Sequence, residues 1–372
     1  MKPKLRFTEF NSDWTKTTLK DIATINPKNE LIPDEFIYID LESVNKGILS
    51  QEKVISKSNA PSRAQRTIKK NDILFQTVRP YQQNNYFVKE IKELPYVAST
   101  GYALIRTNEN PYFVYSILHK KDFLDKVIDR CTGTSFPAIS SNDLGDINII
   151  IPEIKEQTKV SNFLSLLDKK IELQSKKIED LKLFKKGLIH QMKKSSNNWT
   201  EYKISEIFKI TRGVVIPKTD LLENKTDQYI YPVYSSQTSN NGILGYDSKF
   251  DFDGKYLTWT TDGANAGKVF FRNGKFRCTN VCGVLYNDTN NYVDELTAEL
   301  LNYETPKHVS YVGNPKLMNN VMGDIKLFLP DSNESDRVSN ILLKINNKVL
   351  LETNRLNKLN ELKKGFMQSM FV

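Results

Sequence analysis

The stretch LGDINIIIPEIKEQTKVSNFL at residues 144–164 returns as MGDIKLFLPDSNESDRVSNIL at residues 322–342. The alignment continues without a gap from 144–192 onto 322–370, and 16 of its 49 positions are identical. Both copies close on Lys-Lys-Gly. A repeat held at one offset indicates that the chain consists of two related structural units.

A second match marks where each unit begins. The segment WTKTTLKDIATI at 14–25 is similar to WTEYKISEIFKI at 199–210. Between these openings and the repeated tails the two halves share little, as NDILFQTVRPYQQNNYFV (71–88) and GKYLTWTTDGANAGKVFF (254–271) illustrate. The layout is therefore a shared frame that holds two different inserts, with one repeat at 14–198 and the other at 199–372.

The repeated tails become helical in pattern after Pro152 and Pro330, since proline followed by acidic residues suits a helix start. Apolar residues then recur in steps of four and three, which predicts two long helices packed as a coiled coil. Eight of ten seam positions are apolar in each copy, and the polar exceptions match. The alternative is that each helix packs only on the core of its own domain. The seam positions are Val160, Leu164, Leu167, Ile171, Gln174, Ile178, Leu181, Lys185, Leu188 and Met192, and Val338, Leu342, Ile345, Val349, Glu352, Leu356, Leu359, Lys363, Phe366 and Met370.

Chain order predicts how these helices run. A helix of about 35–40 residues is about 55 Å long, so the inserts should lie at opposite ends of it. The second helix must return toward the first insert, which makes the pair antiparallel and brings its end near Trp14. We expect an α+β fold: two α/β or β-rich domains joined by two long antiparallel helices, with pseudo-two-fold symmetry and a nearly circular path.

Both inserts carry β-like runs separated by turn signals. The strands expected are 72–78, 96–105, 255–260 and 281–287, with turns at the Asn-Gly or Asp-Gly pairs 241–242, 253–254 and 273–274. Helical stretches at 111–128 and 292–304 precede the repeated tails.

The 372 residues carry a formal net charge of +9, which favours an anionic partner such as nucleic acid, an acidic protein or a membrane surface. A soluble basic protein without such a partner is the alternative. No apolar run approaches the ~20 residues that span a bilayer, and the N-terminus lacks an apolar signal core. We therefore expect a cytoplasmic protein without a membrane partner. The three cysteines predict neither a disulfide framework nor a metal site.

Side chains that suit DNA contact are concentrated between the expected strands. Arginine can bridge guanine and Asn or Gln can bridge adenine, whereas Lys, Ser and Thr commonly hold phosphates. We expect about a third of them to touch DNA. The candidates are Arg63, Arg66, Gln76, Arg79, Tyr81, Gln82, Arg106, Thr134 and Ser135 in the first insert, and Arg212, Lys218, Ser236, Gln237, Thr260, Asp262, Asn265, Lys268, Arg277 and Asn280 in the second.

Motifs for catalysis are missing. The segment DGANAGKV (262–269) lacks both the glycine spacing and the Ser or Thr of a phosphate loop. Asn26-Pro27 and Asn314-Pro315 are followed by lysine, not by the proline and aromatic residue of an adenine methyltransferase signature. Nothing supplies a nucleophile, a base and an orienting group together, so we expect a non-catalytic chain with no catalytic residue and no metal.

Taken together, the chain resembles the specificity subunit of Type I restriction-modification systems over essentially its whole length. The resemblance rests on the two repeated tails, the Lys-Lys-Gly ends, ILFQTVRP at 73–80 and VASTGYALIR at 97–106. It implies target recognition domains at 1–151 and 195–329 and helical spacers at 152–194 and 330–372.

The resemblance also implies partners and a division of labour. Each target recognition domain would read one half of an asymmetric bipartite site in double-stranded DNA. The helical spacer would set the gap and dock two methyltransferase subunits, which carry S-adenosylmethionine and methylate adenine at N6. Restriction subunits that use ATP and Mg would join to cleave DNA, so this chain would hold no cofactor itself. The partner interface would involve the apolar seam residues of both helices. The alternatives are a coiled-coil adaptor without sequence-specific DNA binding and a stand-alone nucleic-acid enzyme.

Overall fold

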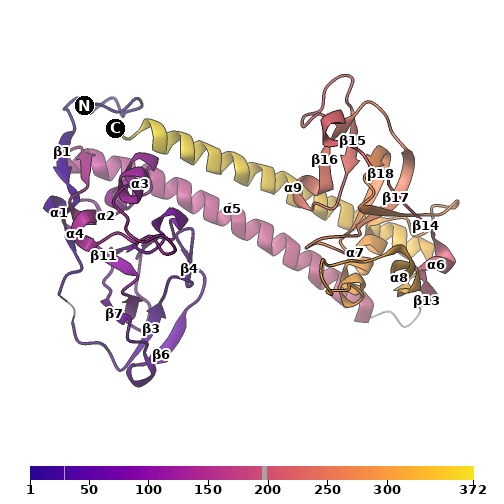
Figure 1. Ribbon diagram of the computed structural model, residues 1–372, viewed down its shortest axis with the longest axis horizontal. Helices are drawn as coiled ribbons and strands as arrows, with labels where there is room; N and C mark the ends of the chain where they lie inside the picture. Colours follow the sequence, from indigo (N-terminus) through magenta and orange to yellow (C-terminus); the bar gives the residue numbers. More distant parts are fainter. Residues whose placement is uncertain (29, 195–198) are drawn as a thin grey trace. The chain divides into compact units, whose positions relative to one another are not determined.

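The computed structural model describes residues 1–28, 30–194 and 199–372. The chain divides into two compact units, of which unit 1 comprises 1–174 with 355–372 and unit 2 comprises 175–354. Two long helices, α5 (Ile154–Lys194) and α9 (Ser332–Ser369), each contribute a segment to both units (Figure 1). Both begin two residues after the repeated prolines, as the sequence predicts.

Unit 1 contains the first part of α5 and the last part of α9, packed against each other. Phe163 meets Phe366 with ring centroids 4.9 Å apart, and Asp168 pairs with Lys363 at 2.5 Å. Rising residue numbers in α5 face falling numbers in α9, so the two segments are antiparallel.

The two ends of the chain meet in this same unit (Figure 1). The backbone N–H of Leu5 donates to the carbonyl of Ser369 at 2.8 Å. The buried ring of Trp14 lies edge-on to Phe371, with centroids 6.3 Å apart. The predicted return of the second helix to Trp14 is therefore confirmed.

Unit 2 contains the rest of the helix pair, again antiparallel. Lys177 contacts Glu352 at 2.9 Å, and Lys185 donates to Asn346 at 3.0 Å. The predicted seam is buried or partly buried at every position, so the α+β fold with paired long helices is confirmed. Its apolar members in the two helices are Val160, Leu164, Leu167, Ile171, Ile178, Leu181 and Leu188, and Val338, Leu342, Ile345, Val349, Leu356, Leu359 and Phe366.

The repeated frame has the same local structure in both units. The strand after each tryptophan pairs antiparallel with the strand before each repeated proline: β1 (Thr15–Thr18) with β12 (Asn148–Ile151), and β13 (Thr200–Lys203) with β20 (Lys326–Leu329). These ladders tie the start of each repeat to the start of its long helix.

The insert of unit 1 is built on two four-stranded sheets, ordered β6-β3-β10-β7 and β2-β11-β8-β9, and a small hairpin, β4-β5. Buried apolar residues fill the strands, as in β8, where all four residues are buried. The remaining elements are β2 (Ala23–Ile25), β3 (Glu35–Ile39), β4 (Val44–Asn45), β5 (Ile48–Leu49), β6 (Lys53–Ser56), β7 (Ala64–Thr67), β8 (Ile73–Gln76), β9 (Tyr86–Phe87), β10 (Tyr96–Ser99), β11 (Tyr102–Thr107), α1 (Leu19–Ile22), α2 (Pro111–Ile117), α3 (Lys121–Ile128), α4 (Ser141–Gly145), η1 (Lys57–Asn59) and η2 (Pro80–Gln82).

Two elements expected in unit 1 are each divided. The single strand predicted at 96–105 is wrong, because the turn before Gly101 directs β10 and β11 into different sheets. The single helix predicted at 111–128 is also wrong. His119 Nδ1 lies 2.9 Å from the carbonyl oxygen of Tyr115, which an uninterrupted helix would use for the N–H of residue 119. The chain breaks there, and α3 starts afresh.

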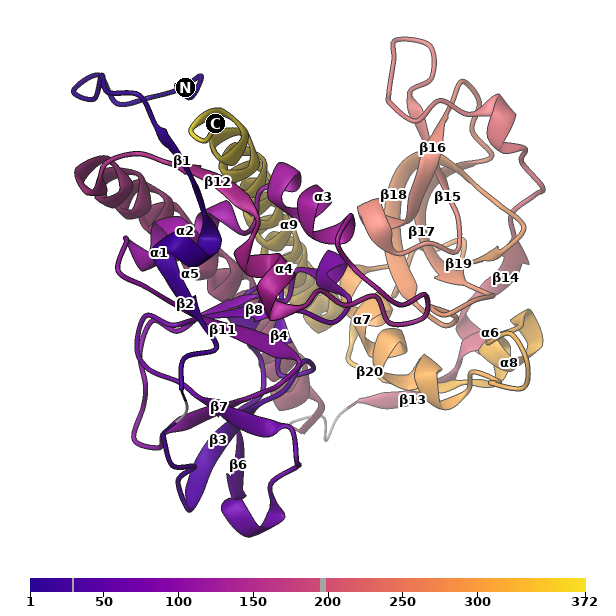
Figure 2. The same ribbon diagram turned by 60° about the vertical axis from the view of Figure 1, so that its left-hand side comes forward.

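The insert of unit 2 is one six-stranded sheet, ordered β14-β19-β17-β18-β15-β16 (Figure 2). Helix α7 and the short helices lie in the same unit. The bounds are β14 (Lys209–Arg212), β15 (Tyr231–Tyr234), β16 (Ile243–Asp247), β17 (Phe252–Thr260), β18 (Val269–Cys278), β19 (Cys282–Tyr286), α6 (Ile204–Ile207), α7 (Glu295–Glu304), α8 (Asn319–Asp324), η3 (Lys218–Asp220), η4 (Ser239–Gly242) and η5 (Thr305–Lys307).

Of the three turns predicted at Asn-Gly or Asp-Gly pairs in this unit, one is confirmed and two are wrong. The turn at 241–242 is confirmed and lies in η4. The turns predicted at 253–254 and 273–274 are wrong, because Gly254 and Gly274 are cross-strand partners inside β17 and β18. Their φ values of 120° and 108° are ones that L side chains rarely adopt, so glycine serves the strand backbone here.

Candidate nucleic-acid interface

The polar residues predicted for DNA contact in unit 1 lie largely on two loops that are hydrogen-bonded to each other. We call residues 77–85 loop A1 and residues 131–138 loop B1. The N–H of Arg79 donates to the carbonyl of Pro137 at 2.7 Å, and the N–H of Ile139 donates to Thr77 at 3.1 Å. Loop B1 also closes on itself, because Thr132 and Ala138 exchange two hydrogen bonds of 2.9 Å.

Unit 2 repeats this arrangement with different residues. Residues 261–268 form loop A2, and residues 309–316 form loop B2. The N–H of Gly263 donates to Pro315 at 2.9 Å, and that of Leu317 donates to Thr261 at 2.9 Å. Ser310 and Lys316 exchange the same pair of bonds. Loop B2 was missed in the sequence, where Pro137 and Pro315, at the repeat offset, were the available signal.

Loops A1 and B1 together combine a partly buried cation with an exposed aromatic ring. The guanidinium carbon of Arg79 lies 4.3 Å from the centroid of the Phe136 ring. Arg79 has a φ of 53°, a left-handed conformation that is uncommon outside glycine. Tyr81, Thr134 and Ser135 are exposed on the same two loops.

Gln76, at the end of β8, and Gln82, on loop A1, support the loop through their hydrogen bonds. Gln76 is buried, and its side-chain amide donates to the Val78 carbonyl and to Gln82 Oε1, both at 2.8 Å. The N–H of Gln76 donates to Asn85 Oδ1 at 2.8 Å. Gln76 and Gln82 therefore fix the shape of the loop.

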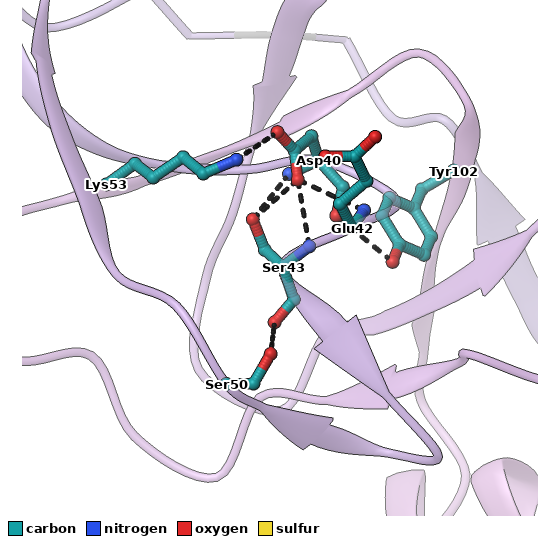
Figure 3. A network of polar contacts seen from close by, with 6 residues as sticks. All are labelled: Asp40, Glu42, Ser43, Ser50, Lys53 and Tyr102. Carbon is teal, nitrogen blue, oxygen red and sulfur yellow. Dashed lines mark hydrogen bonds and ion pairs between the residues drawn. The ribbon is translucent and has the colours of Figure 1, made fainter. Parts of the chain in front are cut away.

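A polar network beside loop A1 holds the β4-β5 hairpin (Figure 3). Asp40 Oδ1 accepts from the N–H and hydroxyl of Ser43, at 2.8 and 2.6 Å, and Oδ2 contacts Lys53 at 2.9 Å. Burial opposes the charge of Asp40, but the bonds from Ser43 and Lys53 prevail and lower its pKa. The Tyr102 hydroxyl donates to the carbonyls of Asp40 and Asn84, at 3.4 and 3.3 Å, which links the network to loop A1.

The remaining arginines predicted in unit 1 differ in how they are held. Arg63 is exposed. Arg66 is half-buried, burial lowers the pKa of its guanidinium, and its Nε has no hydrogen-bond partner within the described part of the chain. Arg106 donates to both oxygens of the buried Asp72, at 2.7 and 2.6 Å. In this conformation Arg106 secures strand β11 to the residue before β8.

Loop A2 has both internal and outward-facing members of the predicted set. Thr260 is buried at its base and hydrogen-bonds to the Asn265 carbonyl, and Asp262 accepts from Thr261 at 2.6 Å. Asn265 and Lys268 are exposed. Asn265 is therefore an outward polar group of loop A2, whereas burial lowers the pKa of the Lys268 ammonium, which lies near Glu299 and Glu295.

Further predicted residues of unit 2 lie around the β18-β19 turn. The N–H of Gly213 donates to Cys282 at 3.0 Å, which places Arg212 beside that turn and its exposed Asn280. The Thr279 hydroxyl contacts Ser235 Oγ at 3.0 Å, so the segment with Ser236 and Gln237 joins the same edge. Lys218 is exposed in η3. Arg277 differs, because it pairs with Asp247 and Asp251 at 2.6 and 3.0 Å.

Metal-binding clusters, membrane-spanning helices and disulfides are absent from the described residues. No group of His, Cys, Asp and Glu among them is placed to hold a metal ion. Within the same residues, no helix is long and apolar enough to cross a membrane. Cys278 and Cys282 are buried thiols that form no disulfide.

Comparison with known proteins decides the family. The model of the Type I restriction modification DNA specificity domain matches residues 11–183 and again 196–361. The chain belongs to this family. It is a specificity subunit, a non-catalytic subunit of a Type I restriction enzyme that recognises DNA, and it carries the specificity domain twice.

Relatives of the specificity subunit are found in Mycoplasma pneumoniae. The putative type I specificity subunit S.MpnORF289P N-terminus is 42% identical over 142 residues, which is 38% of this chain and 74% of the relative. The putative subunit S.MpnORF201P is 33% identical over 205 residues, covering 54% of this chain and 83% of the relative. The Type I restriction enzyme MpnII specificity subunit is 39% identical over 142 residues, covering 38% and 42% of the two chains.

Solved structures support the fold of the specificity subunit. The S subunit of the Type-I restriction-modification system from M. genitalium matches with a TM-score of 0.70 at 16% identity, covering 100% of this chain and 99% of the other. A chain of a type I R-M system complex matches with a TM-score of 0.51 at 19% identity, covering 97% and 98%. At such low identity the likeness concerns the fold.

Proposed function

We propose that this specificity subunit reads an asymmetric, bipartite site in double-stranded DNA, one half-site with each unit. The observation that carries the proposal is the pair of loops A and B, which the same backbone hydrogen bonds hold in both units although the residues on the loops differ. A shared scaffold with different side chains suits two readers of different base sequences. The target recognition domains would be 1–151 and 195–329, and the spacers 152–194 and 330–372.

Charge supports DNA as the ligand. The net charge of +9 favours a polyanion; Arg63, Arg212 and Lys218 are exposed, and the partly buried Arg79 lies on loop A1. Arg63 and Arg79 in unit 1, and Arg212, Lys218 and Lys268 in unit 2, are the cations that we assign to phosphates or guanines. Gln76, Arg106, Thr260 and Arg277 would act indirectly, by holding the loops and strands, because their side chains are engaged within the domain.

We further propose that the outer faces of the long helices dock two methyltransferase subunits. The seam residues are buried or partly buried within the chain, and Val160, Leu164 and Leu342 belong to the cores of their units, so partners would need apolar surface at other positions as well. Such positions exist: large apolar side chains on the helix segments of both units are strongly exposed, and they are Leu166, Leu173 and Leu362 in unit 1 and Leu183, Phe184, Leu350 and Leu351 in unit 2.

An open groove in unit 1 supports this docking surface. It has a volume of about 520 Å³ and runs along the end of α9, where Leu5, Leu362 and Phe366 provide apolar walls. Gly365 lines it, and a Cβ added at this glycine would meet nothing within 4 Å. Gly187, its equivalent in unit 2, is equally open. Glycine inside a helix destabilises it by roughly 0.5–1 kcal/mol relative to alanine, so two open helical glycines suit the close approach of another backbone.

In this proposal the chemistry belongs to the partners. The methyltransferase subunits would carry S-adenosylmethionine and methylate adenine at N6, and restriction subunits would use ATP and Mg to cleave DNA. This chain would hold none of these groups and would act in the cytoplasm, where chromosomal DNA lies.

The proposal is tested by mapping methyladenine in DNA from cells that express this chain with its methyltransferase. We expect one asymmetric sequence with two specified halves and an unspecified gap. Exchanging residues 211–321 for the corresponding insert of another family member should change one half-site and leave the other intact. A change in both half-sites would contradict the modular reading.

A protein-only adaptor predicts a different result. The purified complex should then shift a DNA duplex no more than the methyltransferase alone does. Running the shift at two salt concentrations separates the cases, because phosphate contacts make DNA binding strongly salt dependent.

A further inference from the structure

We propose that loops B1 and B2 each carry an apolar tip that contacts bases of its half-site: Phe136 in unit 1, and Tyr311 with Val312 in unit 2. The proposal rests on the proposed function and deepens it, because it assigns base contact to residues that the sequence did not single out. Phe136 and Val312 are apolar, and Tyr311 lies on a loop that the sequence did not indicate.

The tips are exposed although their loops are anchored. The exposed fractions of the side chains are 63% for Phe136, 69% for Tyr311 and 92% for Val312. Each loop is closed at its base by two hydrogen bonds of 2.9 Å and is tied to its neighbouring loop A through a proline carbonyl. The three side chains are therefore exposed on loops whose backbone is held in place by hydrogen bonds.

The loops reach this arrangement by different routes. Each contains one glycine in the left-handed region, Gly133 with a φ of 89° in B1 and Gly313 with a φ of 74° in B2. The glycine precedes the apolar tip in B1 and follows it in B2. Two unrelated loop sequences thus present large apolar groups from the same anchored frame, which points to a shared requirement.

The surroundings favour DNA as what these tips meet. None of the three side chains belongs to a hydrophobic cluster among the described residues. Arg79 stacks on Phe136 at 4.3 Å, so the ring sits beside a cation that can reach a phosphate or a guanine. Exposed cations or amides also neighbour B2, with Lys316 at its base and Asn265 on loop A2. A narrow apolar tip framed by such groups suits thymine methyl groups or a wedge between base steps.

Substitutions that shorten the tip side chains, made in the assembled complex, test the proposal. Phe136→Ala, and Tyr311→Ala combined with Val312→Ser, should each weaken binding to the duplex identified by methylation mapping about tenfold. Binding to an unrelated duplex should be unchanged, and so should the salt dependence on the target duplex, because no phosphate contact is removed. In these variants, methylation should fall most at DNA sites whose affected half-site differs from the mapped target sequence.

Controls come from exposed apolar residues elsewhere in the same units. Leu31→Ala in unit 1 and Tyr303→Ala in unit 2 remove side chains that are 92% and 57% exposed, and neither should alter DNA binding. Phe136→Leu and Tyr311→Phe should retain most of the affinity if apolar contact is what matters. Thermal unfolding of each variant verifies that the loops are the only change.

Two results would overturn the inference: target affinity equal to wild type in both tip variants, or an equal loss on target and unrelated duplexes. Failure of the proposed function looks different, because the wild-type complex would then prefer no duplex at all.

Discussion

Lys185 on α5 reaches Glu299 on α7, with 2.8 Å between Nζ and Oε1, and the same ammonium donates to Asn346 on α9 at 3.0 Å. The equivalent Lys363 pairs with Asp168 on α5, which also accepts from the Tyr112 hydroxyl on α2. In unit 2 the first lysine of Lys-Lys-Gly contacts the insert helix directly, whereas in unit 1 Lys363 is linked to the insert helix through Asp168. Polar residues at such seam positions can fix the register of a helix pair.

Removing this lysine should destabilise unit 2. Lys185→Ala leaves Glu299 and Asn346 without their shared hydrogen-bond donor. The site is largely buried, because the side chains of Lys185 and Glu299 are only 21% and 15% exposed. We expect the free energy of unfolding to fall by about 1–3 kcal/mol. Denaturant unfolding measures this, and a double-mutant cycle with Glu299→Ala isolates the pair. Additive effects of the two single changes would contradict a direct interaction.

Glu295 beside this site predicts a pH dependence. Burial, followed by the neighbouring charge of Glu299, raises its pKa to about 7. The folded state therefore binds a proton more readily than the unfolded chain, where the pKa is near 4.5. This contribution to stability is complete below about pH 4.5 and is lost as pH rises toward 7.

Glu295→Gln should remove that dependence, because a neutral amide can still accept the hydrogen bond from Asn346. At pH 8 we expect the variant's free energy of unfolding to exceed that of wild type by about 1–3 kcal/mol. At pH 5 this difference should be smaller. Denaturant titrations at both pH values measure it. A constant difference between pH 5 and pH 8 would argue against titration of this carboxyl.

The open helical glycines predict opposite effects on stability and assembly. Gly187→Ala and Gly365→Ala should stabilise the isolated chain by roughly 0.5–1 kcal/mol, since alanine is the better helix former and a Cβ meets nothing there. Both should weaken assembly with the methyltransferase subunit, measured by titration calorimetry. Asn357→Ala, at an exposed position of α9, is the control and should leave assembly unchanged. Unaltered assembly in both glycine variants would remove the close-approach explanation.

Two arginines of unit 1 should behave differently toward DNA. Arg79 stacks on Phe136 and forms no ion pair in the described part of the chain, whereas Arg106 is bound to Asp72. Arg79→Gln should weaken DNA binding and reduce the slope of log affinity against log salt by about 1. Arg106→Gln should lower stability and keep that slope. Affinity measured at several salt concentrations distinguishes the two, and identical slopes for Arg79→Gln and wild type would exclude a phosphate contact.

The repeated frame could be predicted before any coordinates were known. The repeat, the helix starts after Pro152 and Pro330, the antiparallel seam and the return of the chain to Trp14 all follow from spacing, periodicity and chain order, which are local or register properties of the sequence. The family resemblance, too, depends on these segments, because the frame is where the two halves agree.

The construction of the two inserts became visible from long-range contacts in the folded chain. Loop A1 is hydrogen-bonded to loop B1 through Arg79 and Pro137, far apart in the chain, and Gly254 lies opposite Gly274 inside a sheet. Arg106, a DNA candidate by type, is committed to Asp72. These outcomes depend on which groups far apart in the chain form hydrogen bonds with each other once the chain is folded. Residue type alone does not specify those partners.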